Sequence, residues 1–274
     1  MPKPEKKRGI LMVTLVILAT AGIGALTWYI NSFQRYLTDE QILEHLDPET
    51  EAPPRSIQHA LEQLYARLGS DYEGRERFRE PVVALADSEH VEIRRMVAWV
   101  MGCDETEVYR AGLARMLADE DAGVQLNAAC ALSNFNDPRA RPRLLEGLGL
   151  FEVGASVSGT LDIKVEVGEP ASLGVALGVV GTGDRSVDVR TPMNGFVEGL
   201  PKGKTAEVGR GEAVLVVAPG PKVILGVLRG LRFVGRLEDV PRLEPFASGA
   251  VTRMGDDIAE AARAAIAAIK QRGK

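Results

Sequence analysis

Cysteine and histidine are the residues of this sequence with the strongest potential for metal or redox chemistry. Cys103 and Cys130 lack the Cys-x-x-Cys spacing of zinc ribbons and thiol–disulfide enzymes. The histidines form no ligand pattern with these cysteines; they are His45, His59 and His90. We therefore predict no metal-binding and no cofactor-binding residue, and we expect both cysteines to be small buried side chains.

Candidates for acid–base or nucleophilic chemistry are weak. His90 follows Glu89 in an expected turn between helices, where capping or exposure is favoured because no nucleophile accompanies it. The Gly-x-Gly of GVVGTGDRS, residues 178–186, follows no strand–helix unit and indicates a tight turn. Four charged residues are expected to form a solvated helix face with i,i+4 pairing; they are Glu73, Arg75, Glu76 and Arg77. Three serines have no accompanying His and Asp that could activate them as nucleophiles; they are Ser156, Ser158 and Ser172. We predict no catalytic residue.

The N-terminus contains an uncharged apolar run, ILMVTLVILATAGIGALTWYI, at residues 10–30. As a helix it would be about 31 Å long, enough to cross a bilayer core. Trp28 and Tyr29 lie where an interfacial aromatic belt is expected, and the basic flank at residues 1–9 predicts that the N-terminus stays cytoplasmic. The alternative is a signal peptide cleaved after the Ala-Thr-Ala at 19–21, but that motif lies inside the apolar run. We predict an uncleaved anchor.

Short amphipathic helices follow, and two segments repeat. LADSEHVEIRRMVAWVMG at residues 85–102 aligns with LADEDAGVQLNAACALSNF at residues 117–135, with a period of 32 to 33 residues. Each copy predicts two helices, and the acidic stretch before the second can cap its N-terminal amides.

These copies resemble HEAT repeats, in particular the short kind also found in phycobilin lyases. The same pattern returns at the end of the chain as a first helix at 237–249 and a second at 255–271. Two single helices are expected between residue 135 and this C-terminal pair. Residues 137–148 predict a first helix that no second helix follows directly, and residues 221–235 predict a second helix that no first helix precedes directly. A single repeat interrupted by residues 151–220 accounts for both of these single helices. With the upstream helices at 54–69 and 73–86, about four stacked helix pairs would share a core.

The interrupting segment has a different composition. Residues 151–220 hold 13 of the 29 glycines and alternate apolar with polar residues, which predicts short strands and tight turns. Its two halves, 159–180 and 195–217, align with a shift of 35 to 36 residues. The matched pairs are Gly159 with Gly195, Gly168 with Gly203, and Leu173 with Val208.

Two β halves of this kind look like the biotinyl/lipoyl-type domain, a barrel-sandwich hybrid that also occurs in membrane fusion adaptors of secretion and efflux systems. Carrier members of that family attach their group to a lysine in the hairpin between the halves. Here the junction reads GTGDRSVDV, and Arg185 follows Asp184 where the lysine would be expected. An arginine stays protonated and forms no such amide. Lys202 and Lys204 lie in the second half, so we predict no group carrier.

The predicted fold class is α+β: a transmembrane helix, an α-solenoid of HEAT-like helix pairs and an inserted small all-β lipoyl-like barrel-sandwich domain. The predicted parts are a cytoplasmic basic tail (1–9), the transmembrane helix (10–30), a juxtamembrane linker with a short helix (31–53), HEAT-like repeats (54–150), the β insert (151–220) and further HEAT-like repeats (221–274).

A net charge of −5 gives no broad positive field, which excludes a nucleic-acid partner. We predict a non-enzymatic scaffold or adaptor in the inner membrane, with its body outside the cytoplasm and a membrane-associated protein partner, such as a transporter or secretion subunit, on the solenoid's concave face or the insert. Two alternatives stay open: an enzyme or cofactor-attachment lyase, and the disfavoured group carrier.

Overall fold

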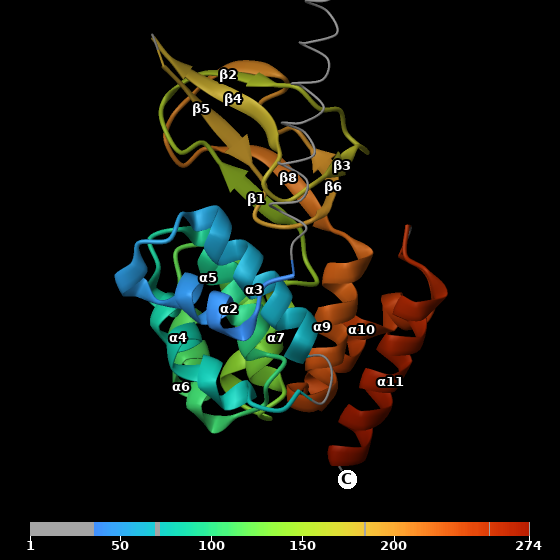
Figure 1. Cartoon of the computed structure of the whole chain (residues 1–274). Helices are drawn as coiled ribbons and strands as arrows, with labels where there is room; N and C mark the ends of the chain where they lie inside the picture. Colours follow the sequence, from blue (N-terminus) through green and yellow to red (C-terminus); the bar gives the residue numbers. More distant parts are fainter. Residues whose placement is uncertain (1–35, 69–71, 184, 252, 274) are drawn as a thin grey trace, which may run out of the picture.

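The structure, a computed structural model, describes residues 36–68, 72–183, 185–251 and 253–273. Its helices form a row, and a compact group of strands lies against one end of several of them (Figure 1). The helical elements before the strands are α2 (Asp39–Leu46), η1 (Pro48–Thr50), α3 (Pro54–Leu68), η2 (Arg75–Phe78), α4 (Arg79–Ala84), η3 (Leu85–Asp87), α5 (Val91–Met101), α6 (Glu107–Met116), α7 (Ala122–Ser133), η4 (Pro138–Ala140) and α8 (Arg141–Glu146). Those after the strands are α9 (Pro221–Val234), η5 (Leu237–Asp239), α10 (Val240–Ala247) and α11 (Asp256–Arg272).

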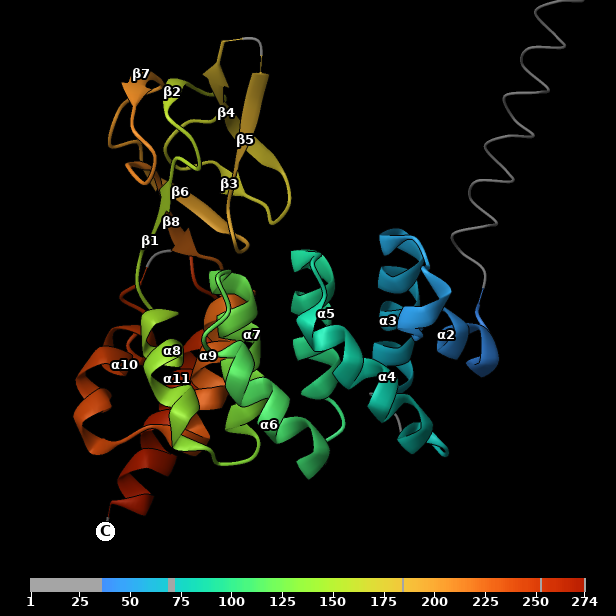
Figure 2. The same cartoon turned by 90° about the vertical axis from the view of Figure 1, so that its left-hand side faces the viewer.

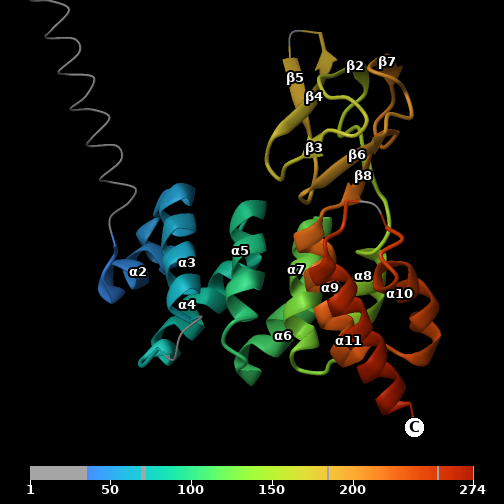
Figure 3. The same ribbon diagram turned by 90° about the vertical axis from the view of Figure 1, so that its right-hand side faces the viewer.

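Within the described residues these helices form five pairs. The first helices of the pairs are α2, α4, α6, α8 and α10, and the second helices are α3, α5, α7, α9 and α11. Each second helix packs against the second helix of the next pair, so the five stand in a row, as Figures 2 and 3 show from opposite sides. This stacking buries apolar faces that one pair could not bury alone.

The short helix α2 belongs to the first of these pairs. It was expected inside a linker at 31–53, but Ile42 and Leu46 are fully buried and α2 packs against α3. A capping box fixes its start: the Thr38 hydroxyl accepts from the Gln41 amide, and the Gln41 side chain accepts from the Thr38 amide. The solenoid therefore has five pairs in the described chain, where the sequence predicted about four.

The strands interrupt the fourth pair. Helices α8 and α9 pack side by side although residues 151–220 separate them in sequence. A Cβ on Gly230 of α9 would lie 2.9 Å from a methyl carbon of Leu144 on α8. A Cβ on Gly147, just after α8, would lie 2.9 Å from Val227 on α9. Two glycines thus permit the close approach that the interrupted-repeat hypothesis requires.

The insert is built from two four-stranded antiparallel sheets in the described residues. One has the order β1-β8-β6-β3 and the other the order β5-β4-β2-β7. The strands are β1 (Phe151–Gly154), β2 (Gly159–Ile163), β3 (Pro170–Ala171), β4 (Ala176–Thr182), β5 (Arg185–Arg190), β6 (Gly195–Gly199), β7 (Thr205–Val208) and β8 (Ala213–Pro219).

The two sheets are related by an internal two-fold pattern. Replacing β1 to β4 by β5 to β8, and the reverse, converts one strand order into the other. The aligned glycines agree with this: Gly159 and Gly195 begin β2 and β6, and Gly168 and Gly203 both have positive φ. The third matched pair was wrong, because Leu173 lies exposed in a loop whereas Val208 is buried in β7.

The helices and the strands have separate apolar cores. The helical core runs from Ile42 on α2 to Ile269 on α11, and the strand core is centred on Leu161 and Val214. Met193, in the loop between β5 and β6, is buried in the helical core. The insert therefore packs against the solenoid through the Met193 side chain of the β5–β6 loop.

The predicted membrane anchor, residues 10–30, lies outside the described residues, as does the tail at 1–9. In the part of the chain that is described, every helix is too short or too polar to span a bilayer.

Candidate protein-interaction surface

The second helices carry a pair of exposed aromatic residues. Tyr65 on α3 and Trp99 on α5 have ring centroids 4.9 Å apart, with planes inclined by 32°. Trp99 is 58% exposed and Tyr65 is 37% exposed. Large aromatic side chains on a rigid surface supply much of the binding energy in protein interfaces. This pair marks the row of second helices as the candidate site.

Arginine–aspartate pairs hold the helices that carry this surface. Arg94 of α5 donates from Nε and Nη2 to Asp119, before α7, over 2.7 and 3.0 Å. Its neighbour Arg95 makes a similar two-bond pair with Asp121 over 2.7 and 2.5 Å. Arg79 at the start of α4 pairs with Asp104 before α6 in the same way, between the same two helix pairs and at the same sequence separation of 25 residues as Arg94 and Asp119. Bidentate pairs of this kind fix orientation as well as charge.

The repeat period also appears in two side-chain bonds to the backbone. Asn127 of α7 donates to the carbonyl of Arg95, and Asn134 donates to the carbonyl of Gly102, each over 3.1 Å. Both bonds join residues 32 apart, which equals the shorter predicted repeat period. The two amides tie α7 to α5 at the middle and at the C-terminal end of the helices.

The aspartates of these pairs are held in their charged form. Burial alone would raise the pKa of Asp119, but hydrogen bonds from Arg94 and the Asp121 amide lower it below its ordinary value. The pKa of Asp137 is also lowered, mainly by hydrogen bonding from Arg139 and further by Arg110. These groups stabilise the solenoid as ions.

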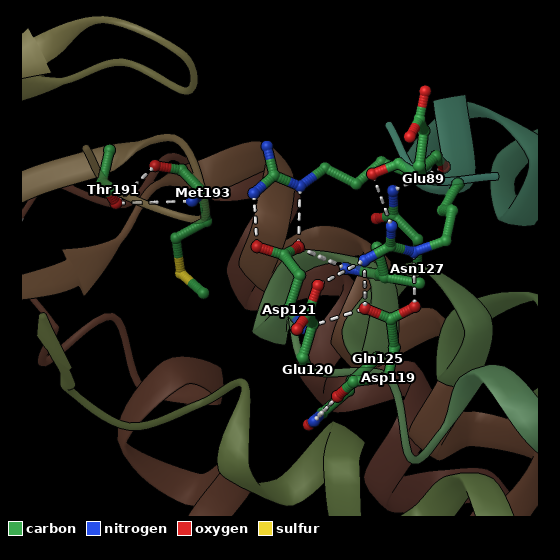
Figure 4. Close-up of polar contacts among 11 residues, drawn as sticks. Glu89, Asp119, Glu120, Asp121, Gln125, Asn127, Thr191 and Met193 are labelled. Carbon is green, nitrogen blue, oxygen red and sulfur yellow. Dashed lines mark hydrogen bonds and ion pairs between the residues drawn. The ribbon is translucent and has the colours of Figure 1, made fainter. Parts of the chain in front are cut away.

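The loop between β5 and β6 docks the insert beside these pairs. Thr191 is buried, and its hydroxyl donates to the Met193 carbonyl and accepts from the Met193 amide (Figure 4). Gly123, in the first turn of α7, faces this loop: a Cβ there would lie 2.5 Å from the carbonyl oxygen of Pro192. The same Cβ would lie 3.0 Å from the carboxylate of Asp121, which caps α7. The Pro192 contact shows that the loop packs directly against the start of α7. Only a glycine leaves room for that contact.

A second contact comes from the turn between α10 and α11. The Arg253 guanidinium lies 5.0 Å from the ring centroid of Phe196 on β6, which is a cation–π distance. With Met193, this contact fixes the insert to two different parts of the solenoid.

Both cysteines are half-buried in the helical region, whereas the sequence predicted that they would be buried. Cys130 on α7 packs against the core, and burial raises the pKa of its thiol to about 12. Burial also raises the pKa of Cys103, whose thiol donates to the Trp99 carbonyl over 3.6 Å. In the described residues no three His, Cys, Asp or Glu side chains gather in a way that could hold a metal ion.

The other polar candidate residues are dispersed over the structure. His90 stands before α5 as expected, without a side-chain cap bond, and its Nε2 lies 3.5 Å from Glu89. In the stretch at residues 73–77, Arg77 forms its ion pairs with Asp39 and Glu40 of α2. The helix there is a short 3-10 turn, which places Arg77 toward α2. The three serines are exposed in the insert, and the Ser158 hydroxyl accepts from the Arg210 amide.

The two lysines in the second half of the insert stand in surface ion pairs. Lys202 lies 3.4 Å from Glu212, and Lys204 forms an ion pair with Glu166. Arg185 is exposed at the start of β5, opposite Thr182 on β4; Asp184 lies outside the described residues.

Comparison with known proteins identifies the repeats. Residues 58–150 match a family model for HEAT repeats. No curated protein matches the chain. Among solved structures, the complex of CpcE and CpcF of phycocyanin lyase from Nostoc sp. is similar, with 17% identity and a TM-score of 0.46, over 86% of this chain and 66% of that chain. This chain thus spans just under two thirds of its length. Residues 58–150, from α3 to α8, are HEAT repeats, as the sequence predicted.

Proposed function

We propose that this protein is a membrane-anchored, non-enzymatic scaffold that binds another protein on the row of second helices. The observation that carries the proposal is the stacked pair of Tyr65 and Trp99, exposed on α3 and α5. HEAT repeats form extended surfaces suited to protein partners. The arginine–aspartate pairs keep α5 and α7 in fixed positions, so little conformational entropy is lost when a partner binds.

The anchor is part of the same proposal. The apolar run at 10–30 is long enough to span a bilayer, and the basic residues before it favour a cytoplasmic N-terminus. The body would then lie outside the cytoplasm, close to the membrane surface. Confinement to that surface raises the effective concentration of the scaffold near a membrane-bound partner.

The insert supports a more specific role. Two four-stranded sheets related by an internal two-fold are consistent with the biotinyl/lipoyl-like fold expected from the sequence. Adaptors of secretion and efflux systems contain domains of that fold, so the proposed partner is a subunit of a transport or secretion complex. Arg185, at the place of the carrier lysine, favours a binding role for the insert over group transfer.

Cross-linking in native membranes tests the proposal. The full chain, expressed at its natural level, is cross-linked in intact cells and purified under denaturing conditions, and the attached proteins are identified. We expect one membrane-associated protein to be recovered reproducibly and in amounts comparable to the bait. Recovery of no protein above the level of an untagged control would contradict a scaffold function.

Protease accessibility tests the orientation separately. In spheroplasts with intact membranes, added protease should digest the body of the protein while a tag at the N-terminus stays protected. Digestion of the body only after lysis would show that the orientation is reversed.

A further inference from the structure

We propose that the aromatic pair of Tyr65 and Trp99, with the acidic side chains beside it, binds a cationic segment of the partner protein, rich in arginine or lysine. This inference rests on the proposed scaffold function and specifies the chemistry of its partner.

The part of the solenoid that carries the aromatic pair is strongly acidic. Residues 36–150 contain 22 Asp and Glu residues against 12 Arg and no Lys, a net charge of −10. Residues 221–274 contain 10 Lys and Arg against 6 Asp and Glu, a net charge of +4. The negative field is therefore concentrated on the part of the solenoid before the insert, and it attracts cations to that part.

The charged side chains of α3 and α5 differ in whether an opposite charge compensates them. Arg94 and Arg95 on α5 are neutralised by Asp119 and Asp121. In contrast, the exposed carboxylates on these helices have no ion pair or hydrogen bond among the described residues; they are Glu62 on α3 and Glu92 on α5.

These two carboxylates lie on the same helix faces as the aromatic residues. Glu62 lies three residues before Tyr65, and Glu92 lies seven residues before Trp99. Residues three or seven apart lie on the same face of an α-helix, so each carboxylate shares a face with its aromatic residue. Met96, three residues before Trp99, is half-buried and packs against the helical core beneath this face.

Aromatic faces and carboxylates together favour a cation of one type. A guanidinium or ammonium group is attracted to the face of a Trp or Tyr ring, and its hydrogens can bond to a nearby carboxylate. An anionic segment would meet uncompensated negative charge, and a purely apolar helix would leave Glu62 and Glu92 desolvated without partners. A cationic segment satisfies both features of the surface.

The test uses Trp99 as its own reporter. The sequence has two tryptophans, so a Trp28→Phe variant of the full chain, in nonionic detergent, emits from Trp99 alone. The probe is a capped peptide of alternating Gly and Arg, and the controls are matched peptides of alternating Gly and Glu or Gly and Gln. We expect a saturable change in Trp99 emission with the arginine peptide, and no change with the two controls. High salt should weaken binding because the attraction is screened.

Three variants locate the binding site of the peptide. Glu62→Gln combined with Glu92→Gln should weaken binding of the arginine peptide by about fivefold or more. The matched control, Glu44→Gln with Glu49→Gln, removes two exposed carboxylates from the first pair and should leave the affinity within about twofold. A parallel Trp99→Ala variant, followed by calorimetry, should weaken binding about tenfold without lowering the melting temperature, since Trp99 is largely exposed.

The outcomes separate this inference from the scaffold proposal. An unchanged Trp99 emission, an equal response to the glutamate peptide, or equal effects of the two double variants would overturn the cationic partner. If the native cross-linking still captures one protein, the scaffold function stands without it. If the arginine peptide binds as expected but no protein is captured in membranes, the surface chemistry stands and the scaffold function falls.

Discussion

Arg141 on α8 and Asp239 before α10 form a two-bond ion pair although 98 residues separate them in sequence. The Nε–Oδ2 distance is 2.8 Å and the Nη2–Oδ1 distance is 2.5 Å. Without the 70 residues of the insert, the separation would be 28, close to the 27 residues between Arg110 on the first helix α6 and Asp137 before α8. The pair thus continues the series of arginine–aspartate pairs across the insertion and joins the fourth repeat to the fifth.

Loss of this pair should destabilise the solenoid. Arg141→Ala leaves Asp239, which is 2% exposed, as a buried charge without its cation, at a cost of about 3 kcal/mol in the free energy of unfolding. The control is Arg143→Ala, which removes an exposed pair with Glu146 and should cost about 0.5 kcal/mol or less. Urea unfolding of both variants measures the difference, and equal costs would refute a structural role for the Arg141 pair.

Stability should fall at acidic pH. The pKa values of Asp119, Asp137 and Asp239 are lowered in the folded state, so the folded chain binds fewer protons than the unfolded chain as the pH falls below about 4. Acidification therefore favours unfolding, and the stability from these groups is present above about pH 5. Urea unfolding from pH 7 to pH 2 should show this decline, and Asp137→Asn should make it shallower. A profile identical to that of the unsubstituted protein would show that Asp137 does not contribute.

The start of α7 should tolerate no side chain at residue 123. Gly123→Ala places a methyl group 2.5 Å from the Pro192 carbonyl oxygen, so backbone must shift and we expect a loss of about 1–3 kcal/mol. Gly112→Ala on α6 is the matched control: its Cβ would meet Met101 at an ordinary 3.6 Å, and the gain in helix propensity is about 0.5–1 kcal/mol. In thermal unfolding, Gly123→Ala should lower the melting temperature and Gly112→Ala should raise it. A neutral Gly123→Ala would show that the loop does not pack here.

The solenoid should fold without the insert. Phe151 and Val217 are paired neighbours on β1 and β8, so the ends of the insert lie close together and a short glycine–serine linker can replace residues 151–220. We expect this shortened full chain to keep its helical circular dichroism with a lowered melting temperature, because the Met193 contact is lost. An unfolded or insoluble product would contradict the description of the insert as a separate unit.

The sequence predicts the repeats well because they are local. The sequence similarity between residues 85–102 and 117–135 corresponds to stacking of these two repeats in the structure. Asn127 and Asn134 bond to backbone carbonyls 32 residues earlier. The first pair was harder to find, since α2 has only eight residues and is followed by a proline-rich stretch. The spacing of Ile42 and Leu46, four residues apart, was the available signal.

The docking of the insert could not be predicted from periodicity. Met193 stands in a segment of β character, yet its side chain is buried among helices whose residues are far away in sequence. The acidic stretch before α7 was expected to cap that helix, and Asp121 does accept from the Val124 amide. The same carboxylate also binds Arg95, a contact between repeats that depends on their relative placement.

The exposed aromatic pair was also missed. Tyr65 and Trp99 are 34 residues apart and each fits an amphipathic helix by itself. Their stacking follows from the side-by-side packing of α3 and α5, which brings successive repeats into contact.

Site-resolved photo-cross-linking tests the proposed binding surface most directly. A photoreactive phenylalanine analogue is placed at Trp99 on α5 or at Val108 on α6, which are 58% and 53% exposed, and the cells are irradiated with membranes intact. If the partner binds the row of second helices, position 99 should capture one protein with a yield several times that at position 108. Equal yields at the two positions, or capture at position 108 alone, would contradict it.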